Sequence, residues 1–383
     1  MKLVCNHIIL GILLALLAAA CIDPYQPQTS TEDINLLVVD GFLNSSDGSA
    51  TVRLSHATAL ADENGIESEP NASVSIVTET GNAYPLTEQQ PGTYLLAGLS
   101  IDPSVKYRLS IVTKDNSTYQ SEYVAIKETP PIDSITWDYT DAGLTVRVTT
   151  HDESARTKYY RWEYIETWEY HAAVASDYIM EKKVPRYRRT DELIYKCWRT
   201  EPSTAIRIAS SERLSEDLIY HFPLAYIPKE SLKISAGYSI LVRQSAISKS
   251  EYDFLEQLRK TTESIGGLFD PQPSQVEGNI SNLNDPNAPV LGFFSAGAAK
   301  EQRLFIRYLD LPEDLKKRSP IYGCQVDTMC VASSEPLPFM CSITLKNATG
   351  NEILGSALYS GQAIIGYTLS SPACADCRTA GRS

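Results

Sequence analysis

Two pairs of acidic residues are the first candidates for chemistry in this sequence. Asp152 and Glu153 are adjacent, and Glu163 lies close to Glu166. Two carboxyl groups that flank one glycosidic bond can serve as an acid and as a base or nucleophile. Carboxylates are abundant in this chain, however, and their spacing along the sequence does not fix their separation in space. We therefore expect no catalytic site, and we keep a hydrolase that acts on glycans or peptides as an alternative hypothesis.

The histidines lead to the same expectation. The sequence has no His-Glu-x-x-His motif, no Gly-x-Ser-x-Gly elbow and no glycine-rich phosphate loop. The histidines beyond residue 20 are scattered along the chain: His56, His151, His171 and His221. We predict neither a metal site nor a cofactor. A cleft that gathers Glu163, Glu166 or His171 around a carboxyl group with a raised pKa would favour the hydrolase.

The cysteines predict disulfide bonds. Beyond residue 21 the chain contains Cys197, Cys324, Cys330, Cys341, Cys374 and Cys377. An even number in an exported chain is typical of a disulfide framework, and spacing alone leaves the pairing open. Cys374 and Cys377 form a Cys-x-x-Cys motif that could instead be a redox pair, or a zinc site with Cys324 and Cys330. We favour disulfides because those two cysteines are too widely spaced for a zinc knuckle.

The N-terminus indicates export and a lipid anchor. Residues 1–20 contain one charge, Lys2, before an apolar run from Ile8 to Ala20. This run is shorter than the ~20 residues of a transmembrane helix, so we predict a signal peptide. It ends in Leu-Ala-Ala-Ala-Cys, which resembles the bacterial lipobox. We predict that Cys21 carries the acyl chains and that the Pro-containing residues 21–34 form a tether.

Composition excludes one class of partner. The formal net charge is −13, and the sequence has no extended basic patch. Such a chain repels the phosphate backbone, so nucleic-acid binding is disfavoured. Tyrosine is in excess, with 22 Tyr against 8 Phe. Because a phenol has an apolar body and a polar tip, this excess favours half-buried strand faces and hydrated recognition surfaces.

Short apolar runs separated by turn residues predict an immunoglobulin-like β-sandwich over residues 35–128. The runs include residues 36–43, 50–57, 72–79, 92–98, 105–113 and 118–126. Pro130 and Pro131 follow, and neither can donate to a central strand. We place a domain boundary there and predict a second, β-rich domain over residues 129–383.

The stretch from Tyr159 to Tyr170 is rich in aromatic residues. On an extended chain, one face carries Tyr160, Trp162, Tyr164, Trp168 and Tyr170. A helix would scatter these side chains around its circumference, so we predict a long strand or a bent pair of strands. The aromatic face either packs against a second sheet as core or forms an exposed ledge for a ligand, and we favour the core. The opposite face, with Arg161 and Glu163, suits contact with water.

One helix is predicted, over residues 248–265. Ser248 and Glu251 have the spacing of a capping box, and Gly266-Gly267 follows the helix. Tyr252, Leu255 and Leu258 recur at helical intervals. This apolar stripe needs a surface to cover, and the simplest one is the second sheet.

Several motifs together resemble the Bacteroidota lipoprotein family catalogued as domain of unknown function 4249. They are LLVVDG (36–41), TPPIDSITW (129–137), YYRWEYIETWEY (159–170), EYDFLEQL (251–258), LFDPQPSQVEGNI (268–280), VLGFF (290–294) and CADCRTAG (374–381). The motifs extend over nearly the whole chain after the signal peptide. The family has no established activity, so the resemblance implies an exported lipoprotein and transfers no site residues.

The expected protein is therefore mainly β, with a sandwich followed by a second β-rich domain that carries one amphipathic helix and disulfides. We expect it to be anchored in the outer membrane through Cys21, on a face that the sequence leaves open. Its expected function is that of a non-enzymatic binding or accessory module, working with a TonB-dependent transporter in nutrient uptake. The alternatives are the hydrolase named above and an adhesive or structural surface module.

Overall fold

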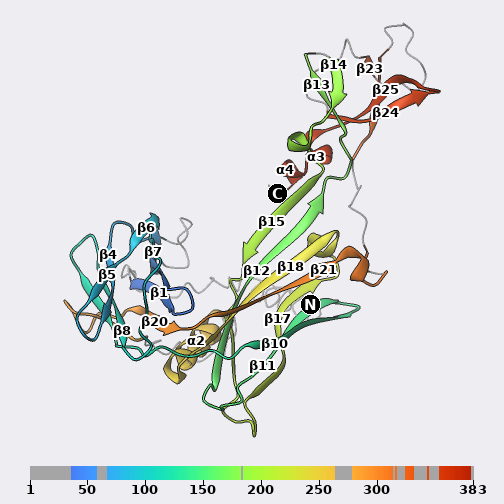
Figure 1. Ribbon diagram of the computed structural model, residues 1–383. Helices are drawn as coiled ribbons and strands as arrows, with labels where there is room; N and C mark the ends of the chain where they lie inside the picture. The colour runs from blue at the N-terminus through green and yellow to red at the C-terminus, as the bar shows by residue number, and fades with distance from the viewer. Residues whose placement is uncertain are drawn as a thin grey trace, which may run out of the picture.

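The computed structural model describes residues 36–57, 67–182, 184–263, 278–313, 315–316, 324–331, 343–344 and 353–380. The predicted signal peptide, Cys21 with the tether predicted to follow it, Cys341 and the last two residues of the predicted helix lie outside these ranges. The described chain is mainly β, as the sequence predicts. Figure 1 shows a first β-sandwich at the left, a second one in the centre and a small C-terminal lobe at the upper right.

The first sandwich contains two sheets around one core. Sheet A has the strand order β20 (Leu291–Gly297), β1 (Leu36–Asn44), β2 (Ser49–Ala57), β7 (Thr93–Leu96) and β6 (Thr87–Gln90), and β3 (Glu67–Ser68) pairs with β2. Sheet B has the order β19 (Ile280–Asn282), β9 (Thr118–Ser121), β8 (Tyr107–Val112), β4 (Ser73–Thr78) and β5 (Ala83–Pro85). Alternate residues of β1 and β2 are buried, as expected for strands with one face on a core.

Two strands of this sandwich come from far along the chain. The prediction assigned residues 129–383 to the second domain, but β19 pairs with β9 and β20 pairs in parallel with β1. Gly292 permits the parallel pairing, because a Cβ at this position would lie 2.1 Å from the carbonyl oxygen of Val39. The sheets therefore extend across the predicted boundary, and residues 280–297 complete the first sandwich.

The second sandwich packs sheet C on sheet D. Sheet C has the order β10 (Ile132–Thr140), β11 (Gly143–His151) and β17 (Leu218–Pro228). Sheet D has the order β15 (Lys196–Pro202), β12 (Tyr159–His171), β18 (Gly237–Ala246) and β21 (Lys300–Arg307), and β16 (Arg207–Ser210) also pairs with β12. The short 3-10 turns are η1 (Thr190–Glu192), η2 (Leu232–Ile234) and η3 (Tyr308–Asp310).

The aromatic face of β12 is the core of this sandwich and not a ledge. Tyr160, Trp162, Tyr164 and Trp168 are buried against apolar residues of sheet C, and Tyr170 packs beside them. Trp162 is only 1% exposed, and its indole N–H donates to Gln244 Oε1 at 2.8 Å. An exposed ledge would leave these rings in water, whereas the facing sheet offers them Leu144 and Val146. The prediction of a core is correct, and that of a ligand ledge is wrong.

Helix α2 (Lys249–Glu263) lies at one end of sheet D, where the helix is predicted. Ser248 Oγ accepts the backbone N–H of Glu251 at 3.0 Å, which caps the helix. Phe254 and Leu255 pack on Ile208 of β16, and Phe254 also meets Phe293 of β20. The helix therefore contacts both sandwiches (Figure 1).

A small lobe lies beyond the far end of the β12–β15 pair (Figure 1). It contains β13 (Tyr178–Glu181), β14 (Val184–Tyr187), the sheet β23 (Ile343–Thr344), β22 (Asp327–Cys330), β25 (Ala363–Ser370) and β24 (Ile353–Ser360), and the short helices α3 (Pro372–Ala375) and α4 (Cys377–Ala380). Tyr178, Met329 and Tyr367 lie in its own small core.

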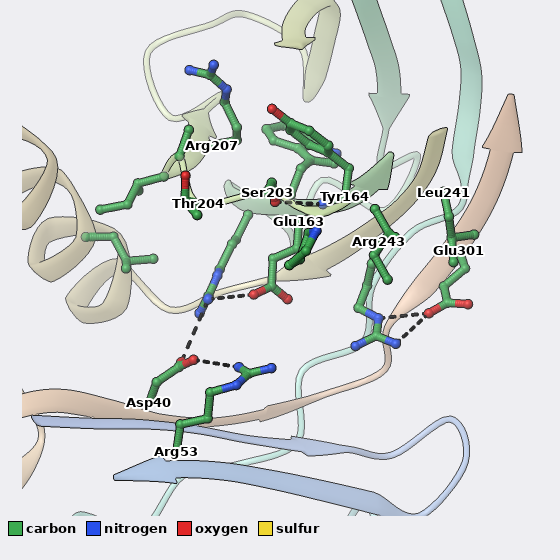
Figure 2. Close-up of a pocket in the computed structure, with 17 residues that line it drawn as sticks. Asp40, Arg53, Glu163, Tyr164, Ser203, Thr204, Arg207, Leu241, Arg243 and Glu301 are labelled. Atoms are coloured by element: carbon green, nitrogen blue, oxygen red, sulfur yellow. Dashed lines mark hydrogen bonds and ion pairs between the residues drawn. The ribbon is translucent and has the colours of Figure 1, made fainter. Parts of the chain in front are cut away.

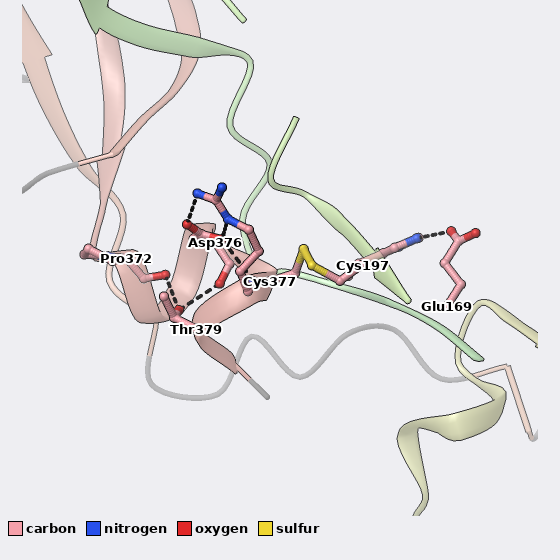
Figure 3. The surroundings of a disulfide bond; sticks show 8 residues. Glu169, Cys197, Pro372, Asp376, Cys377 and Thr379 are labelled. Carbon is pink, nitrogen blue, oxygen red and sulfur yellow. Dashed lines mark hydrogen bonds and ion pairs between the residues drawn. A yellow bond between two sulfur atoms is a disulfide. The ribbon is translucent and has the colours of Figure 1, made fainter. Parts of the chain in front are cut away.

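One disulfide bond joins this lobe to sheet D, and a second lies within the lobe. Cys377 is bonded to Cys197 of β15, as Figure 3 shows, and Cys374 is bonded to Cys324. Cys330 is also disulfide-bonded. The two cysteines of the Cys-x-x-Cys motif thus have different partners. They form neither a redox pair nor a zinc site, and the disulfide prediction is correct for the described cysteines.

Candidate functional site

The outer face of sheet D, which points away from sheet C, contains the candidate site. Strand alternation places Arg161, Glu163 and Ile165 on this face, opposite the buried rings of β12. The strand register sets charges side by side, because Glu163 pairs with Arg243 of β18 and Arg243 pairs with Glu301 of β21. Helix α2 covers one end of the face, and the first sandwich approaches the middle.

A cleft of about 420 Å³ lies where the first sandwich meets this face. We call it the junction cleft (Figure 2). Asp40 of β1 and Arg53 of β2 line one side, and Glu163, Arg243 and Glu301 line the other. Apolar side chains complete the lining: Ile165, Pro202, Ala205, Ile206, Leu241 and Leu255. The volume and the mixture of an apolar surface with a few polar groups are typical of a small-molecule site.

Arg161 is the centre of an ion-pair network in the junction cleft. Its guanidinium lies 2.9 Å from Glu163, 3.8 Å from Asp40 and 3.7 Å from Glu251. Burial opposes the charged form, but these carboxylates hold the pKa of Arg161 above its usual value. Because Asp40 belongs to the first sandwich and Glu251 to α2, the network ties three parts of the fold together.

Two further ion pairs line the cleft. Asp40 accepts from Arg53 at 3.1 Å, and Glu301 lies 2.7 Å from Arg243, as Figure 2 shows. Each carboxylate at the cleft surface therefore has an arginine partner.

Glu251 is the exception among these carboxyl groups. Its residue is only 2% exposed, and its carboxylate accepts from Ser295 Oγ of β20 at 3.2 Å. Burial raises the pKa of Glu251 to about 7, although Arg161 acts in the opposite direction. The cavity that reaches Glu251 has a volume of about 70 Å³. At ~30 Å³ per water, this space suits a few water molecules and not a sugar ring.

One wall of the cleft is a short segment that leaves the sheet. Strands β15 and β16 both pair along β12, and residues 203–206 connect them. Ser203 holds this segment in place, since its N–H donates to the carbonyl of Tyr164 at 2.8 Å and its hydroxyl accepts from the Tyr164 N–H at 3.0 Å. Arg207 donates to the carbonyl of Leu224 at 2.7 Å. Figure 2 shows Arg207 above Thr204 at the edge of the cleft.

The structure does not bring the proposed acid–base residues together. Glu163 is on the outer face of β12, while Glu166 is buried on the inner face between Lys233, at 2.7 Å, and Tyr238, at 2.9 Å. His171 lies at the end of β12 and contacts Glu169. Of these three residues, Glu163 alone lines a cleft described above, and it shares the small cavity with Glu251, whose pKa is raised.

The other acidic pair has a local structural role. The Asp152 carboxylate accepts backbone N–H groups of Ser154, Arg156 and Thr157. Burial opposes ionisation, but the hydrogen bonds from Ser154 and Thr157 hold the pKa of Asp152 well below its usual value. Glu153 is exposed and lies 3.8 Å from His151. Asp152 therefore caps a loop, as acidic residues often do in turns.

A second cleft, of about 600 Å³, lies beside the linker between the sandwiches. Its lining includes Lys127, Glu128 and Arg156, and the last two form a 3.6 Å ion pair at the surface. It lacks the buried charge network of the junction cleft. In the described part of the chain, no three His, Cys, Asp or Glu residues are grouped so that they could hold a metal ion.

The fold and the junction cleft define a protein of two β-sandwiches with a charged cleft between them. Residues 22–303 match the family model described as domain of unknown function (DUF4249), and the chain belongs to this family. No curated protein matches the chain. A solved two-domain fibronectin type III segment from chicken tenascin is 14% identical, with 56% of this chain and 91% of that chain covered and a TM-score of 0.16. None of the described helices is both long and apolar enough to cross a membrane.

Proposed function

We propose that this protein is a non-enzymatic binding module, held at the outer membrane by acyl chains on Cys21. In this proposal it serves as an accessory of a TonB-dependent transporter in nutrient uptake. The lipobox-like residues before Cys21 support the anchor. The disulfides Cys197–Cys377 and Cys324–Cys374 support export, because such bonds persist in oxidising compartments.

The proposal of a binding role rests on the ion pairs that line the junction cleft. Among the described residues of the cleft lining, Asp40, Glu163 and Glu301 are each paired with an arginine, which leaves none of these carboxylates unpaired to activate water. Their unused donor and acceptor positions can still bind a polar ligand. A cleft with an apolar lining and a few fixed polar groups is suited to holding a ligand in one orientation.

One observation favours the hydrolase as a second candidate. Burial gives Glu251 a pKa of about 7, close to that of a general acid, and Asp40 and Glu163 are near it. Glu251 is nearly inaccessible, however, and its cavity is too small for a sugar or peptide unit. We therefore assign Glu251 to the junction between the sandwiches and keep hydrolysis as the second candidate. An adhesive surface module is the third and predicts no transporter partner.

The binding role is tested by crosslinking in intact cells followed by purification of the tagged chain from solubilised membranes. We expect a TonB-dependent transporter among the crosslinked proteins. A matched Cys21→Ser chain, which lacks the acyl chains, should recover much less of it. Recovery of no transporter and no other envelope protein would contradict the proposal. Release of reducing ends from a glycan, or of amines from a peptide, would favour the hydrolase.

A further inference from the structure

Beyond the junction cleft, part of the outer face of sheet D is covered by none of the described elements. We call this part the open face, and it comprises Ile165 and Thr167 of β12, Trp198, Thr200 and Pro202 of β15, Leu241 of β18, and Arg303 and Phe305 of β21. Paired residues of adjacent strands share a face, so these side chains point to the same side. The open face continues the junction cleft, because Ile165, Pro202 and Leu241 belong to both.

Two aromatic rings lie on opposite edges of the open face. Trp198 on β15 is 63% exposed and Phe305 on β21 is 67% exposed. By contrast, Trp162 and Tyr238, which belong to the two central strands of sheet D, are buried. Strands β12 and β18 lie between the two rings, because the strand order of sheet D is β15, β12, β18 and β21. The hydroxyl-bearing Thr167 and Thr200 are aligned with Phe305 across the paired strands. Exposed flat rings beside hydroxyl groups suit a ligand with both apolar C–H faces and polar edges.

The charges of the cleft and the open face favour a neutral ligand. Arg161, Arg243 and Arg307 are each in an ion pair, with Glu163, Glu301 and Asp310. Arg303 donates to Ser239 Oγ at 3.0 Å. A charged ligand that binds at Arg161 would have to break a partly buried ion pair, which is costly. The hydroxyl of Ser239 positions Arg303 without neutralising its charge, so the salt dependence of binding measured below tests whether Arg303 attracts anions. A neutral ligand can use the guanidinium donors and carboxylate lone pairs that the ion pairs leave unused.

The dimensions suit an extended ligand. From the row of Glu163 to the row of Trp198 and Glu169 the strands advance six residues, which is about 20 Å at the rise of a β-strand. We propose that a neutral oligosaccharide binds in the junction cleft and along the open face, with sugar rings stacked on Trp198 and Phe305. This inference rests on the proposed binding role and names its ligand class.

The test is a binding measurement with the purified, acylated full chain in detergent. The probes are short neutral fragments of β-glucan, α-glucan, xylan and mannan, with uronic-acid fragments of matched length. We expect at least one neutral fragment to bind, with an affinity that does not change with salt because no net charge is neutralised. Trp198→Ala and Phe305→Ala should each weaken binding by roughly tenfold or more, as for a truncated hot-spot aromatic. Trp198→Phe should restore most of it.

The matched control is Tyr220→Ala. Tyr220 is 68% exposed and is thus as accessible as Trp198 and Phe305, but it belongs to β17 of sheet C. Its removal should leave the affinity unchanged. Binding of no neutral fragment, binding only of uronic-acid fragments with a strong salt dependence, or equal affinities of the three alanine variants would overturn the proposal. The transporter crosslink is a separate readout, so the partner and the ligand class can fail independently.

Discussion

Replacing Glu251 with glutamine should stabilise the protein above neutral pH. Burial raises the pKa of Glu251 from 4.5 to about 7. Between these pH values the native state keeps the proton that the unfolded chain has lost, so the free energy of unfolding falls as the pH rises. At about 1.4 kcal/mol per pH unit, the ionised form costs ~3 kcal/mol above pH 7. Glutamine resembles the protonated form and avoids this cost.

Equilibrium unfolding in urea, followed at about pH 5 and about pH 8, measures this effect. The glutamine variant and the wild type should be equally stable near pH 5, and the variant should be more stable near pH 8. Glu256→Gln is the matched control, because Glu256 is on the same helix and in surface ion pairs with Arg259 and Lys260. It should show no such pH-dependent gain. A Glu251→Gln variant that is less stable than the wild type at the higher pH would refute the reasoning.

Three further predictions concern the second sandwich and its lobe. Trp162→Ala should lower the free energy of unfolding by about 3–5 kcal/mol because it leaves a cavity in the core. Trp198→Ala should change it by no more than about 0.5 kcal/mol, and unfolding in urea measures both values. Gln244→Leu should cost about 1–3 kcal/mol by leaving the Trp162 indole N–H without its acceptor, and an unchanged urea midpoint would count against that contact. Replacing Cys197 and Cys377 together by serine should cost about 2–5 kcal/mol, and a melting temperature that is equal in wild type and variant would contradict this.

Local patterns in the sequence were sufficient for most elements. The alternation of Tyr160, Trp162 and Tyr164 with polar residues gives β12 one face for a core, and sheet C supplies that core. The capping serine and the apolar stripe give α2 its start and its covered face. In both cases the signal is local, because the spacing of apolar residues along one strand or one helix shows which of its faces is buried.

Long-range pairing could not be predicted in this way. The parallel pair of β1 and β20 joins residues such as Val38 and Leu291, and no local period encodes that partner. The junction cleft depends on the same kind of contact, because Asp40 and Arg161 meet only after both sandwiches have formed. From the sequence, Arg161 and Glu163 indicated only a charged strand face. The sequence analysis interpreted Glu251 only as part of a capping box and did not predict its contact with Arg161 at the junction of the two sandwiches.

The cysteine motif shows the same limit. Cys374 and Cys377 are close in sequence, and a redox pair or a zinc site was a reasonable alternative. They lie on two consecutive short helices, however, and one is bonded to Cys324 and the other to β15 through Cys197. Only the position of the lobe at the end of the β12–β15 pair decides which thiol meets which partner.

Mass spectrometry of the mature N-terminus, on protein extracted from membranes of the native host, tests the proposed anchored role most directly. The account predicts that the first residue is Cys21, with a diacylglyceryl group on its sulfur and an acyl chain on its amine, and that the protein stays with the membrane after an aqueous wash. A mature chain that has no acyl group and is released into the wash would contradict it.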